Sequence, residues 1–173
     1  MAWNSLPRGK GLIALAAYFG LVIGVAARNL AYYPLQVTSN SMFPSVTVGD
    51  WVVISPQHDA AKAAVHRGDI VLFRFPFGSS GRAIKRVVAV AGDQVKADRN
   101  DVRVNGESAL YGSKIPIPEQ MTANSTSEAM VVPEGYYYIL GDNVASSVDS
   151  RSLGLLPQTE VLGLVSAVIK KPW

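Results

Sequence analysis

The chain has 173 residues, 49% of them hydrophobic, which is enough to bury one core and favours a single domain with an appendage. Its net charge of +3 comes from the first 30 residues, where Arg8, Lys10 and Arg28 stand without an acid. Because the body of the chain is balanced, we expect no nucleic-acid partner. The lack of cysteine excludes disulfides and thiolate catalysis, and two histidines are too few for a histidine-rich metal site.

Residues 11–27 form an unbroken run of uncharged, mostly apolar residues, at the short end of what spans a bilayer core. Arg8 and Lys10 precede the run, which favours a cytoplasmic N-terminus and an exported remainder. Tyr32 and Tyr33 follow it, where aromatic residues are typical of the membrane interface. A cleaved secretory signal is the alternative, but no convincing A-x-A site follows the run, so we favour a retained transmembrane helix.

The pattern therefore predicts an anchor over residues 1–30 and a body over 31–173. The body alternates short segments rich in β-branched residues with Gly, Asp and Pro, which predicts a mainly β domain built on antiparallel sheet. The expected strands are 51–54, 70–73, 84–90, 102–104, 136–140 and 161–169.

Three other segments connect these strands. Asn105-Gly106 is typical of a tight turn. Residues 55–66 are expected to form a short helix or a loop, and residues 107–130 a long loop or insertion. Within the latter, Asn124-Ser125-Thr126 fits a glycosylation sequon, but we expect no glycan without a sign of a eukaryotic secretory route.

The segment Ser39-Asn40-Ser41-Met42-Phe43-Pro44 places two hydroxyls two residues apart. In an extended chain both would point to the same side, so that one could attack a carbonyl while the other steadies the developing charge. Taken alone, the segment is more typical of a polar turn between an anchor and the first strand.

A serine nucleophile needs a base, and Lys85 is the candidate. In a strand over 84–90, Lys85 shares the face of Val87 and Ala89, while Arg86 points the other way. Burial on an apolar face would lower the pKa of this lysine toward neutrality. The alternative is a strand lysine whose stem covers apolar surface. His66, in a polar stretch, is expected to be an exposed loop residue.

The segment 141–151 supplies a third group of polar residues. Ser147 could orient a neutral lysine amine, with Asp149 and Arg151 holding the loop rigid behind it. The alternative is a polar loop with an ion pair of little energetic weight.

In this order the segments resemble the type I signal peptidases, the S26 family of membrane-anchored Ser-Lys endopeptidases. The similarity covers nearly all of residues 11–170. The matching motifs are Tyr33–Val37 through Ser41–Pro44, Arg67–Phe73, Lys85–Val88 with Gly92-Asp93, and Gly141–Asn143 with Ser147, Asp149–Arg151 and Gly154. Departures from the family pattern occur at Asn40, Ser45, Ala89, Ala91 and Val144, none of them in the proposed dyad.

The resemblance implies that Ser41 is the nucleophile and Lys85 the general base, with the Ser41 backbone N–H and the Ser39 hydroxyl as the oxyanion hole. It implies supporting roles for Ser147, Asp149 and Arg151. Substrate would pair as a strand with residues 36–38 and 81–84, and small side chains would enter pockets lined by Gln36, Val37, Met42 and Ile84. It implies cleavage after Ala-x-Ala, with no cofactor and no metal.

The expected partners are signal-peptide-bearing preproteins and the lipid bilayer, and we expect a monomer. The expected location is the bacterial cytoplasmic membrane, with the catalytic domain on its outer face. Two alternatives remain: a specialised relative that processes conjugation pilins or mitochondrial inner-membrane precursors, and a non-enzymatic, membrane-tethered binding module. A self-cleaving repressor is rejected, because this chain has an anchor and no DNA-binding headpiece.

Overall fold

The computed structural model describes residues 18, 20, 32–56, 65–75, 81–97, 101–109 and 129–172. The chain separates into two units, Met1–Ala31 and Tyr32–Trp173. Of the expected anchor, Tyr18 and Gly20 are described, and both are helical. Among the described residues, no helix is long and apolar enough to cross a membrane.

The second unit is mainly β, as predicted, and every strand pair in it is antiparallel. Its larger sheet has seven strands in the order β1-β2-β11-β3-β4-β9-β10. Their bounds are Tyr33–Gln36 (β1), Trp51–Pro56 (β2), Val161–Ile169 (β11), Ile70–Arg74 (β3), Arg82–Ala89 (β4), Tyr136–Leu140 (β9) and Leu156–Pro157 (β10).

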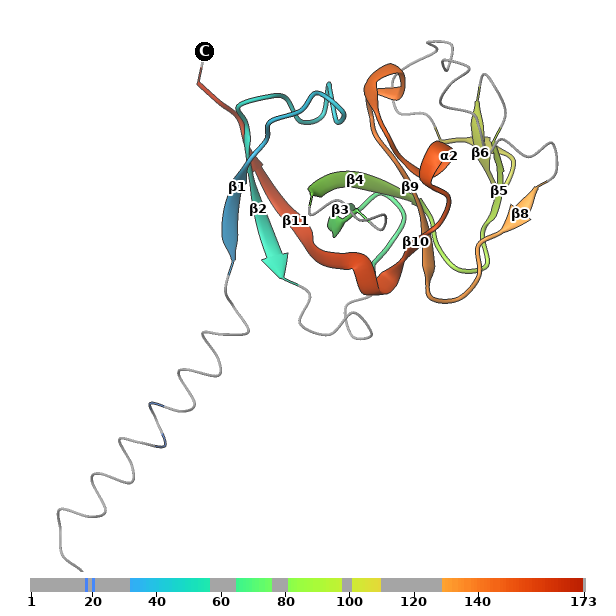
Figure 1. Cartoon of the computed structure of the whole chain (residues 1–173), viewed down its shortest axis with the longest axis horizontal. Coiled ribbons are helices and arrows are strands. Elements are labelled where there is room, and N and C mark those ends of the chain that lie inside the picture. The colour runs from blue at the N-terminus through green and yellow to red at the C-terminus, as the bar shows by residue number, and fades with distance from the viewer. Residues whose placement is uncertain are drawn as a thin grey trace, which may run out of the picture. The chain divides into compact units, whose positions relative to one another are not determined.

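A smaller sheet has four strands in the order β7-β6-β5-β8. These strands are Glu107–Ser108 (β7), Val102–Val104 (β6), Gln94–Ala97 (β5) and Met130–Val131 (β8). One-turn helices follow β9, at Val144–Ser146 (η2), Ser150–Leu153 (α2) and Gln158–Glu160 (η3). In Figure 1 the smaller sheet lies beside β9 and α2, and β1 and β2 lie at the opposite side of this unit.

All six expected strands are present, and those over 102–104, 136–140 and 161–169 have the predicted bounds. Asn105 and Gly106 both have positive φ, of 53° and 87°, as the tight β6–β7 turn requires. The strands that periodicity missed are short (β1, β5, β7, β8 and β10), with too few residues to show a clear alternation.

Two segments differ from the expectation or lie beyond the description. The ends of the expected loop 107–130 are the strands β7 and β8, and residues 110–128, with the sequon, lie outside the described residues. Ser55 and Pro56 finish β2, and residues 57–64 lie outside as well.

The alternation predicted for β4 holds only as far as Val87. Lys85 and Val87 are buried, and Arg86 lies on the other face. A register shift between Val87 and Ala89 then buries Val88 and Ala89 together in a different cluster. The prediction that Ala89 lies on the same strand face as Lys85 and Val87 was therefore wrong, because the bulge after Val87 changes the face on which the following residues lie.

Three hydrophobic clusters form the core. One joins the smaller sheet to the end of β4 and to β9. Another lies between β3, β4, β9 and the start of β11. The third lies beneath β1, β2 and the turn that carries Ser41, and it includes Met42, Val46 and Ile54. This third cluster gives the turn a fixed base.

Candidate active site

Ser41 and Lys85 meet in the second unit although 44 residues separate them. Lys85 lies in β4, and Ser41 lies in the turn over residues 40–46. Lys85 Nζ is 2.8 Å from Ser41 Oγ and donates a second hydrogen bond, of 3.0 Å, to the Ile84 carbonyl. Both residues are buried, with 8% of Ser41 and 3% of Lys85 exposed. The serine and the lysine predicted to act together are thus in direct contact.

The surroundings of Lys85 disfavour its charged form. Desolvation by burial lowers the pKa of Lys85 to about 8, and the Arg151 charge acts in the same direction. The carboxylates of Asp149 and Asp142 raise the pKa but do not offset burial. A useful fraction of the amine is therefore neutral near pH 7 to 8.

The turn around Ser41 is held by its own backbone and by the segment after β9. Phe43 N donates to Asn40 O at 3.1 Å and Val46 N donates to Met42 O at 2.9 Å, which closes the turn. From the other side, Asn143 N donates to the Ser41 carbonyl and Asn143 Nδ2 to the Asn40 carbonyl, each at 3.0 Å. These bonds fix the backbone that presents the Ser41 hydroxyl.

Ser39 lies beside the dyad. Its Oγ is 3.4 Å from Ser41 Oγ, and the residue is exposed. The hydrogen bonds among the described residues leave the Ser41 backbone N–H without an acceptor. Two donors therefore lie close to the Ser41 hydroxyl.

Asp149 organises the loop behind the dyad. Its carboxylate pairs with Arg151 at 2.8 Å, and both side chains are buried. It also accepts from Gly141 N at 2.9 Å and, as the N-cap of α2, from Arg151 N. A buried ion pair with this many hydrogen bonds is costly to break by removing one partner. The Asp149–Arg151 ion pair is therefore not the weak, solvent-exposed pair that was the alternative interpretation of this segment.

Ser147 is buried, with 1% of it exposed, and its Oγ has no hydrogen-bond partner among the described residues. The contact expected between this hydroxyl and the lysine amine is therefore not formed in this structure. Gly141 explains the close packing here, because a Cβ at that position would overlap both the Ser147 hydroxyl and the Ser41 carbonyl. Ser147 thus lies next to the nucleophile turn, and its role stays a prediction.

Sequence reasoning missed a second ion pair, which is partly buried. Arg86 donates to both carboxylate oxygens of Asp142, at 2.9 and 2.7 Å, and to the Gly68 carbonyl at 2.7 Å. This pair ties β4 to the loop that carries Asn143. The available signal was a pair of opposite charges in two of the matching motifs, but sequence alone does not show that they meet.

Lys170, near the C-terminus, also holds the turn over residues 40–46. The sequence did not indicate this contact. Lys170 Nζ donates to the Ser45 carbonyl at 2.8 Å and to Asp50 Oδ2 at 3.0 Å. Asp50 also accepts from Thr47 N and Thr47 Oγ1, each at 2.9 Å, and from Lys171 N at 3.0 Å. The hydrogen bonds from the Thr47 and Lys171 N–H groups hold the pKa of Asp50 well below its usual range.

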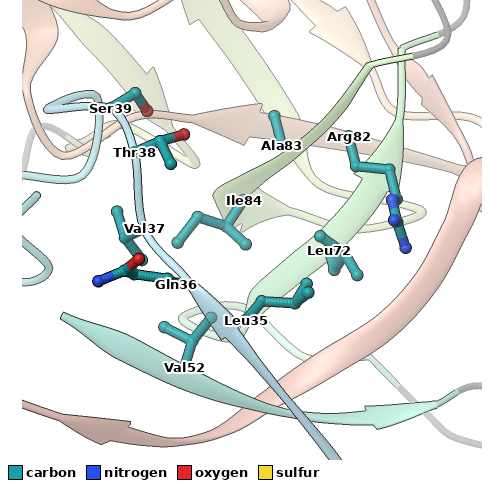
Figure 2. Close-up of a pocket in the computed structure, with 10 residues that line it drawn as sticks. All are labelled: Leu35, Gln36, Val37, Thr38, Ser39, Val52, Leu72, Arg82, Ala83 and Ile84. Carbon is teal, nitrogen blue, oxygen red and sulfur yellow. The ribbon is translucent and has the colours of Figure 1, made fainter. Parts of the chain in front are cut away.

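A cavity of about 290 Å³ opens beside Ser39. Its lining is mostly apolar, with Gln36, Thr38, Ser39 and Arg82 as the polar residues, and Figure 2 shows how they surround it. The full lining is Leu35, Gln36, Val37, Thr38, Ser39, Val52, Leu72, Arg82, Ala83 and Ile84.

Two strand edges along this cavity are unpaired among the described residues. β1 pairs only with β2, and β4 pairs with β9 only from Arg86 onward, which leaves Arg82–Lys85 without a neighbour on that side. An extended peptide could therefore add as a strand between them.

Of the residues predicted to bind substrate, Gln36, Val37 and Ile84 line the cavity. Met42 does not: it is 1% exposed and belongs to the core cluster beneath the turn. A residue next to a nucleophile can point into the core or into the groove, and local sequence does not distinguish the two.

Other candidate groups are accounted for as well. His66 is exposed as predicted, and its N–H donates to Asp69 at 2.8 Å. In the described part of the chain, no group of three or more His, Cys, Asp or Glu side chains could hold a metal ion.

A serine hydroxyl in contact with a buried lysine, beside an open groove with unpaired strand edges, is suited to acyl transfer on an extended peptide. Comparison with known proteins gives the family. The family model for "Signal peptidase, peptidase S26" matches residues 11–170, and the chain belongs to this family.

Two relatives agree with this assignment. The chain is 28% identical to a signal peptidase I of Pseudomonas aeruginosa, over 86% of this chain and 68% of the relative. It is 27% identical to signal peptidase I V of Bacillus subtilis, over 88% of this chain and 94% of the relative. The crystal structure of a signal peptidase I from Enterococcus faecalis is 28% identical, with a TM-score of 0.47, covering 60% of this chain and 98% of that one.

Proposed function

We propose that this chain is a membrane-bound serine endopeptidase that cleaves N-terminal signal peptides from exported preproteins. Ser41 is the nucleophile and Lys85 the general base. The observation that carries the proposal is the 2.8 Å contact between Lys85 Nζ and Ser41 Oγ, in a buried site that lowers the pKa of the lysine to about 8.

The reaction begins with the neutral amine of Lys85. Its lone pair takes the proton of Ser41 as Oγ attacks the scissile carbonyl carbon, which gives a tetrahedral intermediate. When this collapses, the C–N bond breaks, the Lys85 ammonium gives its proton to the leaving amine, and an acyl-enzyme ester on Ser41 remains. A water then attacks the ester with Lys85 again as the base, and Ser41 regains its proton as the new carboxyl end leaves.

The oxyanion is stabilised by the Ser41 N–H and the Ser39 hydroxyl. Support for this comes from the free Ser41 N–H and from the 3.4 Å between the two serine hydroxyls. Preorganised donors of this kind contribute about 3 to 4 kcal/mol each to transition-state stabilisation. Asp149, Arg151 and Ser147 act as positioning residues behind the dyad, through the backbone of the loop that contacts Ser41.

The groove selects small side chains at the first and third residues before the cleaved bond, which is the Ala-x-Ala pattern. Val37 and Ile84 support this, because they line the cavity with apolar side chains from two different segments of the chain. A narrow pocket excludes large residues by steric cost rather than by attracting small ones.

The chain works as a monomer at the bacterial cytoplasmic membrane. Its N-terminus is cytoplasmic, residues 11–27 anchor it, and the catalytic domain lies on the outer face. The apolar run preceded by Arg8 and Lys10 supports this arrangement.

The test is cleavage of a panel of precursors with small residues at these two positions, followed by N-terminal sequencing of the products. Ser41→Ala and Lys85→Met should each reduce kcat by at least about 10³-fold, because the nucleophile or its base is lost. Both variants should still bind the precursor.

Two matched variants control for the substitutions themselves. Ser108→Ala and Lys96→Met change an exposed serine and an exposed lysine in the smaller sheet, and they should cleave as the parent chain does. Unchanged cleavage in Ser41→Ala and Lys85→Met would refute the proposal, whereas binding without any cleavage in the parent chain would favour a non-enzymatic binding module.

A further inference from the structure

Arg82 is the one charged residue that lines the described cavity. It is the first residue of β4, it is exposed, and Figure 2 shows it well away from Ser39. The rest of the lining is apolar or neutral. An extended peptide bound in this groove would therefore interact electrostatically with a single positive charge.

The charge of Arg82 is reinforced from the neighbouring strand. Arg74 lies directly opposite Arg82 in the β3–β4 pair, and it is also exposed. None of the ion pairs among the described residues involves either arginine. The hairpin sequence from 74 to 82 contains no acid that could offset them. Like charges directly opposite on a sheet destabilise each other, so an anion between them would be favoured.

The position of Arg82 along the strand sets its distance from the chemistry. Arg82 lies three positions before Lys85 in β4, and at the usual rise of a strand their Cα atoms are about 10 Å apart. A substrate added along the unpaired edge of β4 has the same rise per residue. If the cleaved bond lies at Ser41 and the residues before it run along β4 toward Arg82, Arg82 faces a side chain about four or five residues before that bond, because a small side chain already occupies the third position.

We propose that Arg82, supported by Arg74, is a specificity-determining residue that makes the groove prefer an acidic over a basic substrate side chain at the fourth or fifth residue before the cleaved bond. The proposal rests on the proposed function, since it needs the substrate to lie along β4. It adds a charge preference to the size preference of the two small-residue pockets.

The size of the effect follows from the exposure of the two arginines. Solvent screens such charges, so one favourable pair changes a rate constant by about threefold. Replacing an acid by a base exchanges attraction for repulsion and should change kcat/KM by about tenfold at low salt.

The experiment uses the full chain in detergent and a soluble peptide with alanine at the first and third positions before the cleaved bond. Glutamate, glutamine or lysine is placed in turn at the fourth and fifth positions, and kcat/KM is measured at low and high salt. The parent chain should prefer glutamate to lysine about tenfold at one of these positions, and salt should reduce the ratio.

The variants test whether the preference belongs to Arg82. Arg82→Gln should reduce the glutamate-to-lysine ratio to about threefold, and Arg82→Glu should reduce it further, to about one, because the reversed charge then offsets the charge of Arg74. Lys96→Glu makes the same change in net charge on an exposed position of the smaller sheet and should keep the ratio of the parent chain.

Each outcome decides one question. A parent chain that cleaves all peptides equally, or an Arg82→Glu variant that keeps the parent ratio, overturns the role of Arg82 and leaves the proposed function intact. A parent chain that cleaves none of the peptides counts against the proposed function and removes the basis of the inference.

Discussion

Lys85 illustrates how one side chain can be buried and still be useful. Desolvation lowers its pKa to about 8, while the nearby carboxylates of Asp149 and Asp142 favour the charged form. The two effects leave the amine able to exist in either state near neutral pH. An amine in this position can both take and return a proton, as an acyl-transfer cycle requires.

The pH dependence of cleavage follows from this pKa. Only the neutral amine can accept the Ser41 proton, so kcat/KM should rise about tenfold per pH unit below pH 8 and level off above it. At pH 7 about one molecule in ten would be active. The measurement is kcat/KM on an uncharged peptide from about pH 6 to about pH 10, in the parent chain and in Lys96→Met as a control.

Two results would contradict this account of Lys85. One is a rate independent of pH over that range, and the other is a rate that still rises at the upper end of the range, as the ordinary lysine pKa of 10.5 would give.

At the scale of elements, the turn over residues 40–46 is the part that must be held still. It has little secondary structure of its own, and it is fixed by the core beneath it, by Asn143 from the loop after β9, and by the end of β11 through Lys170. Three separate parts of the unit therefore converge on the segment that carries Ser41.

Asp50 links Lys170 and Lys171, near the C-terminus, to the segment that follows the Ser41 turn, because it accepts hydrogen bonds from both lysines and from Thr47. Asp50→Asn should lower the Tm and reduce kcat more than it raises KM, because an amide cannot accept all the hydrogen bonds that now secure Thr47, Lys170 and Lys171. The carboxylate contributes stability above its unfolded pKa, and this contribution is lost as pH falls through its lower folded pKa.

Thermal unfolding and steady-state kinetics, both at pH 7, measure these effects. Glu134→Gln, at an exposed turn residue, is the matched control. If Asp50→Asn and Glu134→Gln behave alike in both measurements, the C-terminal residues do not position the turn.

At the scale of the whole molecule, we expect the apolar run over residues 11–27 to confine the catalytic unit to the membrane that holds its proposed substrates. A chain that begins at Arg28 should cleave soluble peptides with the parent kcat/KM and process bilayer-inserted precursors more slowly. The physical reason is the loss of a shared surface, which raises the effective concentration of enzyme near substrate.

The comparison is made on one precursor in two forms, as a soluble peptide and reconstituted in vesicles. The ratio of the two rates corrects for any change in intrinsic activity. Equal ratios for the full and the shortened chain would show that residues 1–27 contribute nothing to processing.

Much of the site was predictable from sequence because its reactive residues lie in short segments with recognisable spacing. Ser39 and Ser41 stand two residues apart, Lys85 lies on the apolar face of a strand, and Asp149 and Arg151 are close enough to pair within one turn. The strands were predictable wherever β-branched residues alternate over several positions.

What only the tertiary structure decided is which distant segments meet. The registers of β3, β4 and β9 bring Lys85 to Ser41, Arg86 to Asp142 and Arg82 to the end of the groove. Met42, to which the family resemblance had given a place in the substrate pocket, packs in the core, and the residues after β11 bring Lys170 to Asp50. Residue type and local spacing determine what a side chain can do, but its partner is set by sheet register and packing, which depend on the chain as a whole.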